Sequence, residues 1–124
     1  MHAVGIDIIE IERIAETVRR FGERFLRRIY TDGEIAYCRG RAPQLAARFA
    51  AKEAMMKALG TGVRGVGWRD IEVVRSRGGP PAILLHGRAL KVAERQGVTQ
   101  SALSISHSRE YAVASVVIEK RDAP

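Results

Sequence analysis

The sequence predicts an α+β fold, in which an antiparallel sheet packs against helices. Helical patterns fill most of the chain from residue 10 to residue 60, and strand patterns joined by short turns fill most of the remainder. Strands that follow one another through short turns pair antiparallel. The chain has 124 residues, 46% of them hydrophobic, and no linker-like stretch, so we expect a single domain over residues 1–124.

The first third of the chain predicts one strand and then helices. Residues 2–9 are rich in valine and isoleucine, which favours a strand. Residues 10–28 have a helical pattern, with a break predicted near Gly22. Thr31 and Glu34 have the spacing of a capping box, which predicts a short helix that continues through Tyr37-Cys38.

A longer helix is predicted next, beginning near Pro43. Proline suits the first turn of a helix, because the N–H that it lacks has no partner there. The run Gly60-Thr61-Gly62 ends the pattern, since glycine readily adopts the left-handed conformation found after a helix.

The second half reads mainly as strands. Glycines and prolines at residues 77–81 predict a hairpin turn, and Gly97 predicts the end of a helix. The predicted elements are strands at 71–75 and 82–86, a helix at 87–96, and strands at 101–108 and 111–119.

The chain is basic, with a net charge of +7 and a pI near 10.3. This balance indicates an acidic partner, but it does not distinguish nucleic acid, an anionic surface, an acidic protein and a phosphorylated small molecule. Arginines crowd the first quarter and alternate with glutamates, a pattern that a solvated helical face also produces. These arginines are Arg13, Arg19, Arg20, Arg24, Arg27 and Arg28.

The single cysteine, Cys38, excludes an intrachain disulfide and fits a reducing compartment, so we expect a cytoplasmic protein. The first residues do not have the basic start and long apolar segment of a signal peptide. No apolar run is long enough to cross a bilayer, and we expect no membrane partner.

Asp7 is the first candidate for chemistry. It lies in a strand that otherwise suits burial, where a carboxylate must be paired, protonated or bound to a ligand. Gly5, on the same face of the strand, leaves space beside it. The alternative is that Asp7 caps the following helix or pairs with an arginine.

The helix that begins near Pro43 carries a lysine inside an apolar stripe. At about 100° per residue, Lys52 falls on the same face as four apolar residues. A buried ammonium needs an anion, unless the side chain extends its amine to the solvent. The four apolar residues are Leu45, Phe49, Met56 and Leu59.

Other charges on this helix suggest a phosphate site. Glu53 and Asp7 would supply two carboxylates, and proteins usually hold magnesium with one or two carboxylates, substrate phosphates and waters. Lys52, Lys57 and Arg48 would contact phosphate from other directions. The alternative is an exposed Glu53–Lys57 pair, which contributes only a few tenths of a kcal/mol to a helix.

His107 is the third candidate. Alternation along the predicted strand places it on one face with Leu103 and Ile105. A histidine at the end of an inward face is either hydrogen-bonded into the core or faces a cleft, and the strand alone favours the core.

Three segments together resemble the holo-acyl-carrier-protein synthases, the short, single-domain class of 4′-phosphopantetheinyl transferases. They are GIDIIEIERI at residues 5–14, RFAAKEAMMKALG at residues 48–60 and SISHSREYA at residues 104–112. The likeness covers essentially the whole chain, and the second segment is highly specific. The resemblance implies the phosphopantetheinyl transferase fold.

The resemblance also implies roles for residues at matching positions. Asp7 and Glu53 match carboxylates that hold Mg²⁺ against the pyrophosphate of coenzyme A. Lys57 matches a contact to the phosphate region, and His107 matches a histidine at the coenzyme site. The family lines its coenzyme pocket at Arg48, Gly60, Thr61 and Gly62, and docks the acidic acyl carrier protein at Arg13, Arg20 and Arg24.

The family reaction transfers phosphopantetheine from coenzyme A to a serine hydroxyl of the carrier and releases adenosine 3′,5′-bisphosphate. It needs a cation for the pyrophosphate, positive groups for the leaving phosphate and a base for the serine. We expect Glu53 to be that base, directly or through a water, with His107 as the other candidate.

Two positions differ from larger, two-domain relatives. Phe49 replaces a tryptophan, as is ordinary for the short class, and Ile9 replaces a further acidic residue. Ile9 removes a possible third metal ligand, so waters and coenzyme oxygens would complete the coordination. The short class assembles with sites between subunits, and we therefore expect a homotrimer.

The competing hypothesis is a small basic module that binds nucleic acid. It would explain the charge without Asp7 or Glu53. However, aromatic residues make up only 6% of the chain, and two carboxylates would repel phosphate if no cation were present. We expect no nucleic-acid partner.

Overall fold

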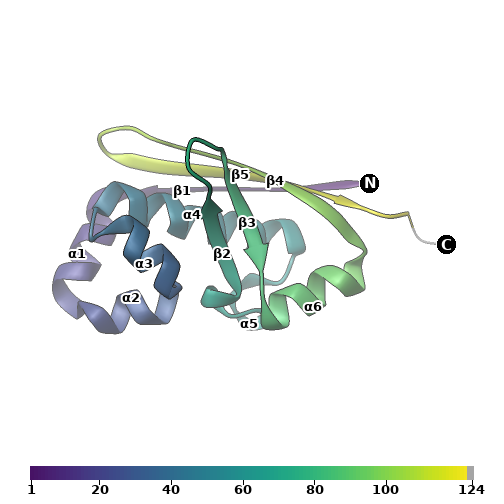
Figure 1. The fold of residues 1–124 in the computed structure, drawn as a ribbon, viewed down its shortest axis with the longest axis horizontal. Coiled ribbons are helices and arrows are strands. Elements are labelled where there is room, and N and C mark those ends of the chain that lie inside the picture. Colours follow the sequence, from purple (N-terminus) through teal and green to yellow (C-terminus); the bar gives the residue numbers. More distant parts are fainter. Residues whose placement is uncertain (123–124) are drawn as a thin grey trace.

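The computed structural model describes residues 1–122, so the last two residues of the expected 1–124 domain lie outside the described part. Twelve elements follow one another along the chain (Figure 1). They are β1 (His2–Glu10), α1 (Ile11–Phe21), α2 (Glu23–Ile29), α3 (Asp32–Cys38), α4 (Ala42–Leu59), α5 (Gly62–Gly65), a 3₁₀ turn (Trp68–Asp70), β2 (Ile71–Arg75), β3 (Pro81–Leu85), α6 (Gly87–Gln96), β4 (Val98–His107) and β5 (Tyr111–Lys120).

The predicted α+β class is confirmed, but the strands form two sheets where one was expected. β1, β5 and β4 make a three-stranded antiparallel sheet in the order β1-β5-β4, while in the described part of the chain β2 and β3 pair only with each other. The β2–β3 hairpin crosses in front of α4 (Figure 1). Short turns therefore predicted each local pairing correctly, whereas they carry no information on whether one hairpin joins another.

Local signals account for most helix ends. Gly22 adopts a φ of 55° between α1 and α2, which is where the break was predicted. Thr31 and Glu34 form the predicted capping box at the start of α3. Pro43 lies in the first turn of α4, and Gly60 ends this helix in the left-handed conformation. The short α5 and the 3₁₀ turn were not predicted.

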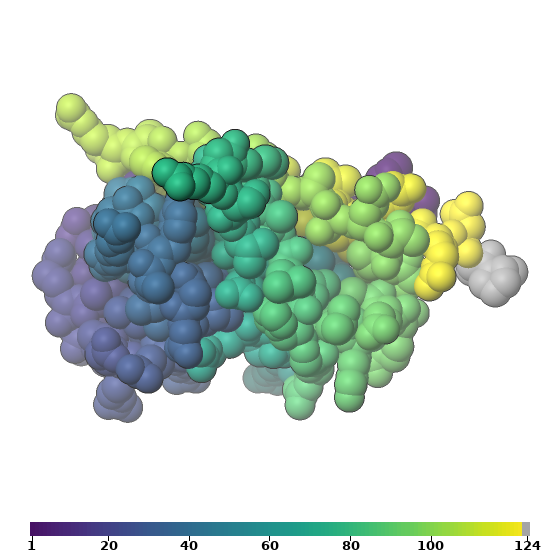
Figure 2. Space-filling view, viewed as in Figure 1, coloured from purple at the N-terminus to yellow at the C-terminus, as the bar shows by residue number. Residues whose placement is uncertain are grey.

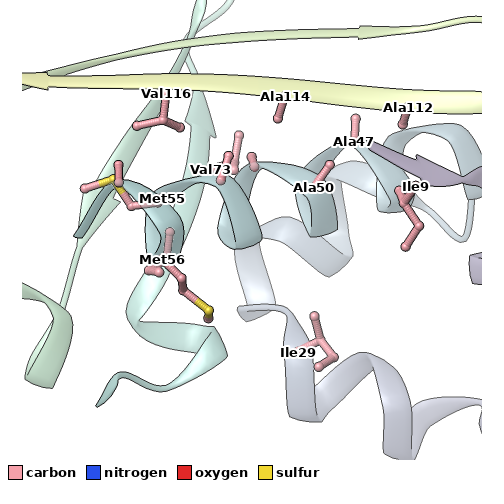
Figure 3. Close-up of a cluster of buried hydrophobic side chains, with 14 of the residues drawn as sticks. Ile9, Ile29, Ala47, Ala50, Met55, Met56, Val73, Ala112, Ala114 and Val116 are labelled. Atoms are coloured by element: carbon pink, nitrogen blue, oxygen red, sulfur yellow. The ribbon is translucent and has the colours of Figure 1, made fainter. Parts of the chain in front are cut away.

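Helix α4 forms the centre of the hydrophobic core. Most of its residues are buried, because the three-stranded sheet covers one side of the helix and α1–α3 cover another. Figure 3 shows Val116 and Ala114 of β5 above α4, with Met55 and Ala50 below them. The small residues of both elements let the helix approach the sheet closely.

The closest approach is at Gly5 in β1. A Cβ atom at this position would lie 1.8 Å from the carbonyl oxygen of Ala54 and 2.9 Å from the amide nitrogen of Ala58. The space that Gly5 leaves is thus filled by the backbone of α4. This contact sets Asp7, two residues further along β1, beside the same helix.

No helix of residues 1–122 covers the opposite face of the three-stranded sheet. All helices lie on one side of this sheet (Figure 1). Val4, Ile6 and Ile8 of β1 point to the other side and are 56%, 58% and 62% exposed. A row of exposed branched apolar side chains on a sheet is typical of a surface that another protein covers. Within residues 1–122, no helix combines the length and apolar character needed to cross a membrane.

Candidate active site

Asp7 and Glu53 line one pocket of about 390 Å³. β1 supplies Asp7 and α4 supplies Glu53, and the pocket continues past Arg13 of α1 to the aromatic rings of Phe25 and Phe49. The two carboxylates that the sequence suggested as a pair therefore line the same pocket, because Gly5 brings β1 against α4.

The electrostatics of this carboxylate pocket are unfavourable for two free anions. Burial raises the pKa of Glu53, and the neighbouring Asp7 raises it further, while Lys57 and Arg13 act in the opposite direction. Lys57 donates hydrogen bonds of 3.0 Å to both Asp7 Oδ1 and the carbonyl oxygen of Ile6. Its side chain is half-exposed, so its ammonium can also contact a ligand. This is a site where a further cation would be stabilised.

Ile9 lies on the same face of β1 as Asp7 and is 9% exposed. It lines the carboxylate pocket with an apolar side chain. Within residues 1–122, no cluster of three or more histidine, cysteine, aspartate or glutamate side chains could hold a metal ion. Any metal bound by Asp7 and Glu53 would take its other ligands from water and substrate, as Mg²⁺ commonly does.

A second pocket, of about 330 Å³, contains Arg48 and His107. It lies between α4, the end of β2 and the end of β4, and its lining includes Tyr37 and Arg75. His107 is exposed, so it faces a cleft, although the strand pattern alone had favoured the core. Two arginines and a histidine at one pocket suit an anionic ligand.

Arg48 is a buried part of this second pocket, which we call the arginine pocket. Only 3% of the residue is exposed, and its guanidinium carbon lies 4.2 Å from the centre of the Tyr37 ring. Within the described chain, its buried Nε has no hydrogen-bond partner, and its only hydrogen bond is a long one of 3.4 Å from Nη1 to the carbonyl oxygen of Gln44. A buried guanidinium with an unused donor is expected to bind an anion.

The structure corrects the expectation for Lys52. Its side chain is fully buried and forms an ion pair with Glu34, with 2.8 Å between Nζ and Oε1. The same ammonium donates to the carbonyl oxygens of Trp68 and Ile71, which uses its three N–H groups. Burial lowers the pKa of Lys52, and Glu34 opposes this effect. Lys52 therefore has no donor left for coenzyme phosphate, and the anion that its position predicted is a carboxylate of the protein.

The remaining coenzyme candidates lie at the end of α4. Gly60 caps the helix, and Thr61 and Gly62 lead into α5. None of the three lines the carboxylate pocket or the arginine pocket. The hydroxyl of Thr61 is buried and has no hydrogen-bond partner within the described residues. Their contact with coenzyme stays a prediction.

The arginines of α1 and α2 differ in their partners. Arg19 pairs with Glu12 and Glu16, and Arg27 pairs with Glu23. Within residues 1–122, no ion pair involves Arg13, Arg20 or Arg24, the three that the resemblance assigned to carrier docking. Arg24 also borders a groove of about 670 Å³, whose apolar lining includes Phe21, Phe49 and Trp68.

Sequence reasoning missed two residues of these sites. Arg75 ends β2 and had no motif to mark it, although it shares the pocket of Arg48 and His107. Glu34 was recognised only as part of a capping box, because no pattern connects it with Lys52, 18 residues further along the chain.

Comparison with known proteins defines the class of this fold and site. A family model described as the 4′-phosphopantetheinyl transferase superfamily matches residues 3–116. The chain therefore belongs to this superfamily. This finding confirms the resemblance seen in the three sequence segments.

Relatives of known sequence and structure define the group more closely. The chain is 56% identical to a holo-[acyl-carrier-protein] synthase of Koribacter versatilis over 119 residues, which cover 93% of this chain and 95% of that protein. The holo-[acyl-carrier-protein] synthase of Neisseria meningitidis superposes with a TM-score of 0.87 and is 37% identical, over 95% of this chain and 98% of that one. That of Helicobacter pylori, solved in complex with coenzyme A, superposes with a TM-score of 0.86 and is 34% identical, over 94% and 99%. The chain has holo-[acyl-carrier-protein] synthase function, as the sequence predicted, and the nucleic-acid alternative is not favoured.

Proposed function

We propose that this chain, as a single domain, transfers 4′-phosphopantetheine from coenzyme A to a serine hydroxyl of an acidic acyl carrier protein, in a magnesium-dependent reaction. The observation that carries this proposal is the meeting of Asp7 and Glu53 in one pocket, with Lys57 hydrogen-bonded to Asp7. We further propose the cytoplasm as its compartment, because a free cysteine such as Cys38 stays reduced there.

Asp7 and Glu53 would hold Mg²⁺, which neutralises charge on the pyrophosphate when it is bound. Lys57 holds the Asp7 carboxylate through a 3.0 Å hydrogen bond and anchors to the carbonyl oxygen of Ile6. Its remaining donor is available to a phosphate oxygen. Without a cation, burial and then Asp7 raise the pKa of Glu53, and a bound Mg²⁺ would lower it again. Glu53 is our candidate for the base that accepts the serine proton, directly or through a water, because it lines the same pocket as Asp7.

The arginine pocket would bind the adenosine bisphosphate part of coenzyme A. Arg48 offers an unpaired Nε inside this pocket, and Arg75 and His107 add donors around it. Positive groups at this position stabilise the charge that the leaving phosphate gains during transfer. The H. pylori relative was solved in complex with coenzyme A, which supports coenzyme A as the source of the phosphopantetheine group.

The carrier would dock on α1 and α2. Arg13, Arg20 and Arg24 are exposed and form no ion pair with a carboxylate of the described chain. The groove beside Arg24 adds an apolar surface to the arginines. An acidic protein with apolar side chains among its carboxylates complements such a surface.

A homotrimer with sites between subunits would join the two pockets. Within one chain the carboxylate pocket and the arginine pocket share no lining residue. The β4–β5 hairpin, with His107 near its turn, extends past the body of the molecule (Figure 2). The exposed Val4, Ile6 and Ile8 supply an apolar surface for association.

Mass spectrometry tests the proposed reaction. An apo carrier mixed with coenzyme A, Mg²⁺ and this protein should gain the phosphopantetheine mass on its serine, and chelation of Mg²⁺ should stop the gain. Asp7→Asn and Glu53→Gln should each lower kcat/KM at least about 100-fold. Glu94→Gln, which changes an exposed carboxylate on α6, is the matched control and should leave the rate unchanged. Transfer that persists without divalent cations would remove magnesium from the proposal.

Mixing inactive variants tests the position of the site. Glu53→Gln and His107→Ala chains should recover activity when they are unfolded and refolded together, because a mixed assembly can combine an intact carboxylate pocket with an intact arginine pocket from another chain. Each variant refolded alone is the control. Light scattering should show a mass of three chains, and a monomer without recovered activity would contradict the shared site.

Charge reversal tests the docking surface. Arg20→Glu or Arg24→Glu should raise KM for the carrier, most strongly at low salt, with KM for coenzyme A unchanged. Arg13→Glu should also raise KM for the carrier, but Arg13 lines the carboxylate pocket, so this variant should change KM for coenzyme A as well. Arg95→Glu on α6 changes the net charge by the same amount and is the matched control. A change confined to coenzyme affinity would place the carrier elsewhere.

A further inference from the structure

The Lys52–Glu34 pair is a buried ionic contact that the proposed reaction does not use. Both side chains are completely buried, with 2.8 Å between Lys52 Nζ and Glu34 Oε1. Two charges removed from water are costly unless geometry and hydrogen bonds compensate for the loss of solvent. Here the hydrogen bonds are nearly complete, which indicates a site with a defined geometry.

These hydrogen bonds connect three parts of the fold to α4. Glu34, in the first turn of α3, accepts from the backbone N–H groups of Thr31 and Val73 at 2.8 and 2.9 Å. Lys52 donates to the carbonyl oxygens of Trp68, in the 3₁₀ turn, and Ile71, at the start of β2. α3, the 3₁₀ turn and β2 are thereby held to one point on α4.

This point is one residue from the carboxylate of the proposed metal site. Lys52 and Glu53 leave α4 about 100° apart, so the ion pair fixes one side of the helix and the carboxylate pocket lies on another. On the β1 side, the helix is held by its contact with Gly5. α4 is therefore held from two directions, and both contacts influence how it is rotated about its axis.

A small rotation would be enough to separate the two carboxylates. A side-chain group lies roughly 5–6 Å from a helix axis, so a turn of about 10° moves it by about 1 Å. A displacement of that size can lower a reaction rate about 100-fold. The pair and the backbone groups it satisfies are directional, whereas an apolar contact would tolerate such a turn.

We propose that Lys52 and Glu34 are positioning residues, which fix the rotation of α4 so that Glu53 faces Asp7. This inference rests on the proposed function of the carboxylate pair. Neither residue touches the substrates. The pair acts through the helix and sets the geometry in which Glu53 and Asp7 bind one cation.

The double variant Lys52→Met/Glu34→Gln carries the test. Each single variant leaves one partner buried alone, which strongly destabilises the fold, whereas removal of both charges avoids this penalty. In the double variant we expect kcat to fall at least tenfold and KM for the carrier to stay within twofold of the original value. Mn²⁺ affinity, measured by electron paramagnetic resonance with coenzyme A present, should fall at least fivefold.

Tyr30→Phe is the matched control, because it also removes a buried hydrogen bond to α4. The Tyr30 hydroxyl donates to the carbonyl oxygen of Leu45 at 2.7 Å, about two turns before Glu53. This variant should lower the melting temperature and leave kcat and Mn²⁺ affinity unchanged. A folded double variant with the original kcat and Mn²⁺ affinity would overturn the positioning role, as would an equal kcat loss in Tyr30→Phe. Absence of transfer by the unmodified chain would instead overturn the proposed function.

Discussion

Replacement of Gly5 by alanine should disturb the fold and the carboxylate pocket together. The added Cβ would lie 1.8 Å from the Ala54 carbonyl oxygen and 2.8 Å from its carbonyl carbon. Both neighbours are backbone atoms of a buried helix, so no side-chain rotation can relieve the overlap. β1 and α4 must move apart by more than about 1 Å to restore an ordinary contact.

The size of the effect follows from this displacement. Overpacking of a closely packed interior costs about 1–3 kcal/mol, which corresponds to a fall of roughly 4–12 °C in melting temperature for a chain of this length. Asp7 lies two residues from Gly5 and would move with β1 away from Glu53. A misplacement of about 1 Å in a reacting geometry lowers the rate about 100-fold.

Calorimetry and the carrier mass assay measure the two effects. Gly40→Ala is the matched control, because Gly40 has a φ of 72° and open space around it. That variant should lose only about 1–2 kcal/mol from backbone strain and retain its activity. If Gly5→Ala had the melting temperature and the turnover rate of the unmodified chain, the close packing of β1 on α4 could not be what fixes the position of Asp7.

Three further predictions concern single side chains. Arg48→Lys should raise KM for coenzyme A about tenfold, because lysine keeps the charge but loses the planar guanidinium and its cation–π contact with Tyr37; an unchanged KM in steady-state kinetics would contradict the proposed role of Arg48. Cys38 should not react with a thiol reagent in the folded protein, because it is fully buried and burial raises its pKa, and rapid colour development without denaturant would contradict this. Burial acts to raise the pKa of Glu72, but hydrogen bonds from His86 and Thr31 outweigh it and lower this pKa below the ordinary 4.5. Glu72→Gln should therefore cost about 1 kcal/mol in urea unfolding at pH 7, and the difference should disappear as the pH falls through the lowered folded pKa; a cost that does not shrink as the pH is lowered below 4.5 would refute the assignment.

The sequence predicted those features that depend on near neighbours along the chain. The break at Gly22, the capping box of Thr31 and Glu34, and the end of α4 at Gly60 all follow from backbone preferences within a few residues. Strand bounds were less accurate, since β4 begins at Val98 and not at Ser101. The ends of strands depend on the partner strand, which local patterns do not describe.

Features that depend on distant neighbours were only partly predictable. The inward position of Asp7 could be read from its strand, but its contact with α4 depends on Gly5 and Ala54, which are far apart in sequence. Lys52 was correctly expected to need an anion, and its partner Glu34 could not be identified, because helix periodicity gives a direction and not a neighbour. The role of Arg75 had no local signal and emerged only when β2 was placed beside α4.

Helix α4 carries Arg48 for one pocket and Glu53 for the other, within six residues of one rigid element. A substitution that bends or shifts α4 would therefore alter both proposed roles, donor binding by Arg48 and proton acceptance by Glu53, in the same event. Kinetic constants alone cannot show which of the two pockets such a variant has damaged. A stabilising change elsewhere that restores the position of α4 could recover both pockets at once. The tolerance of this protein to mutation should thus be lowest along one helix, with the surface loops free to diverge.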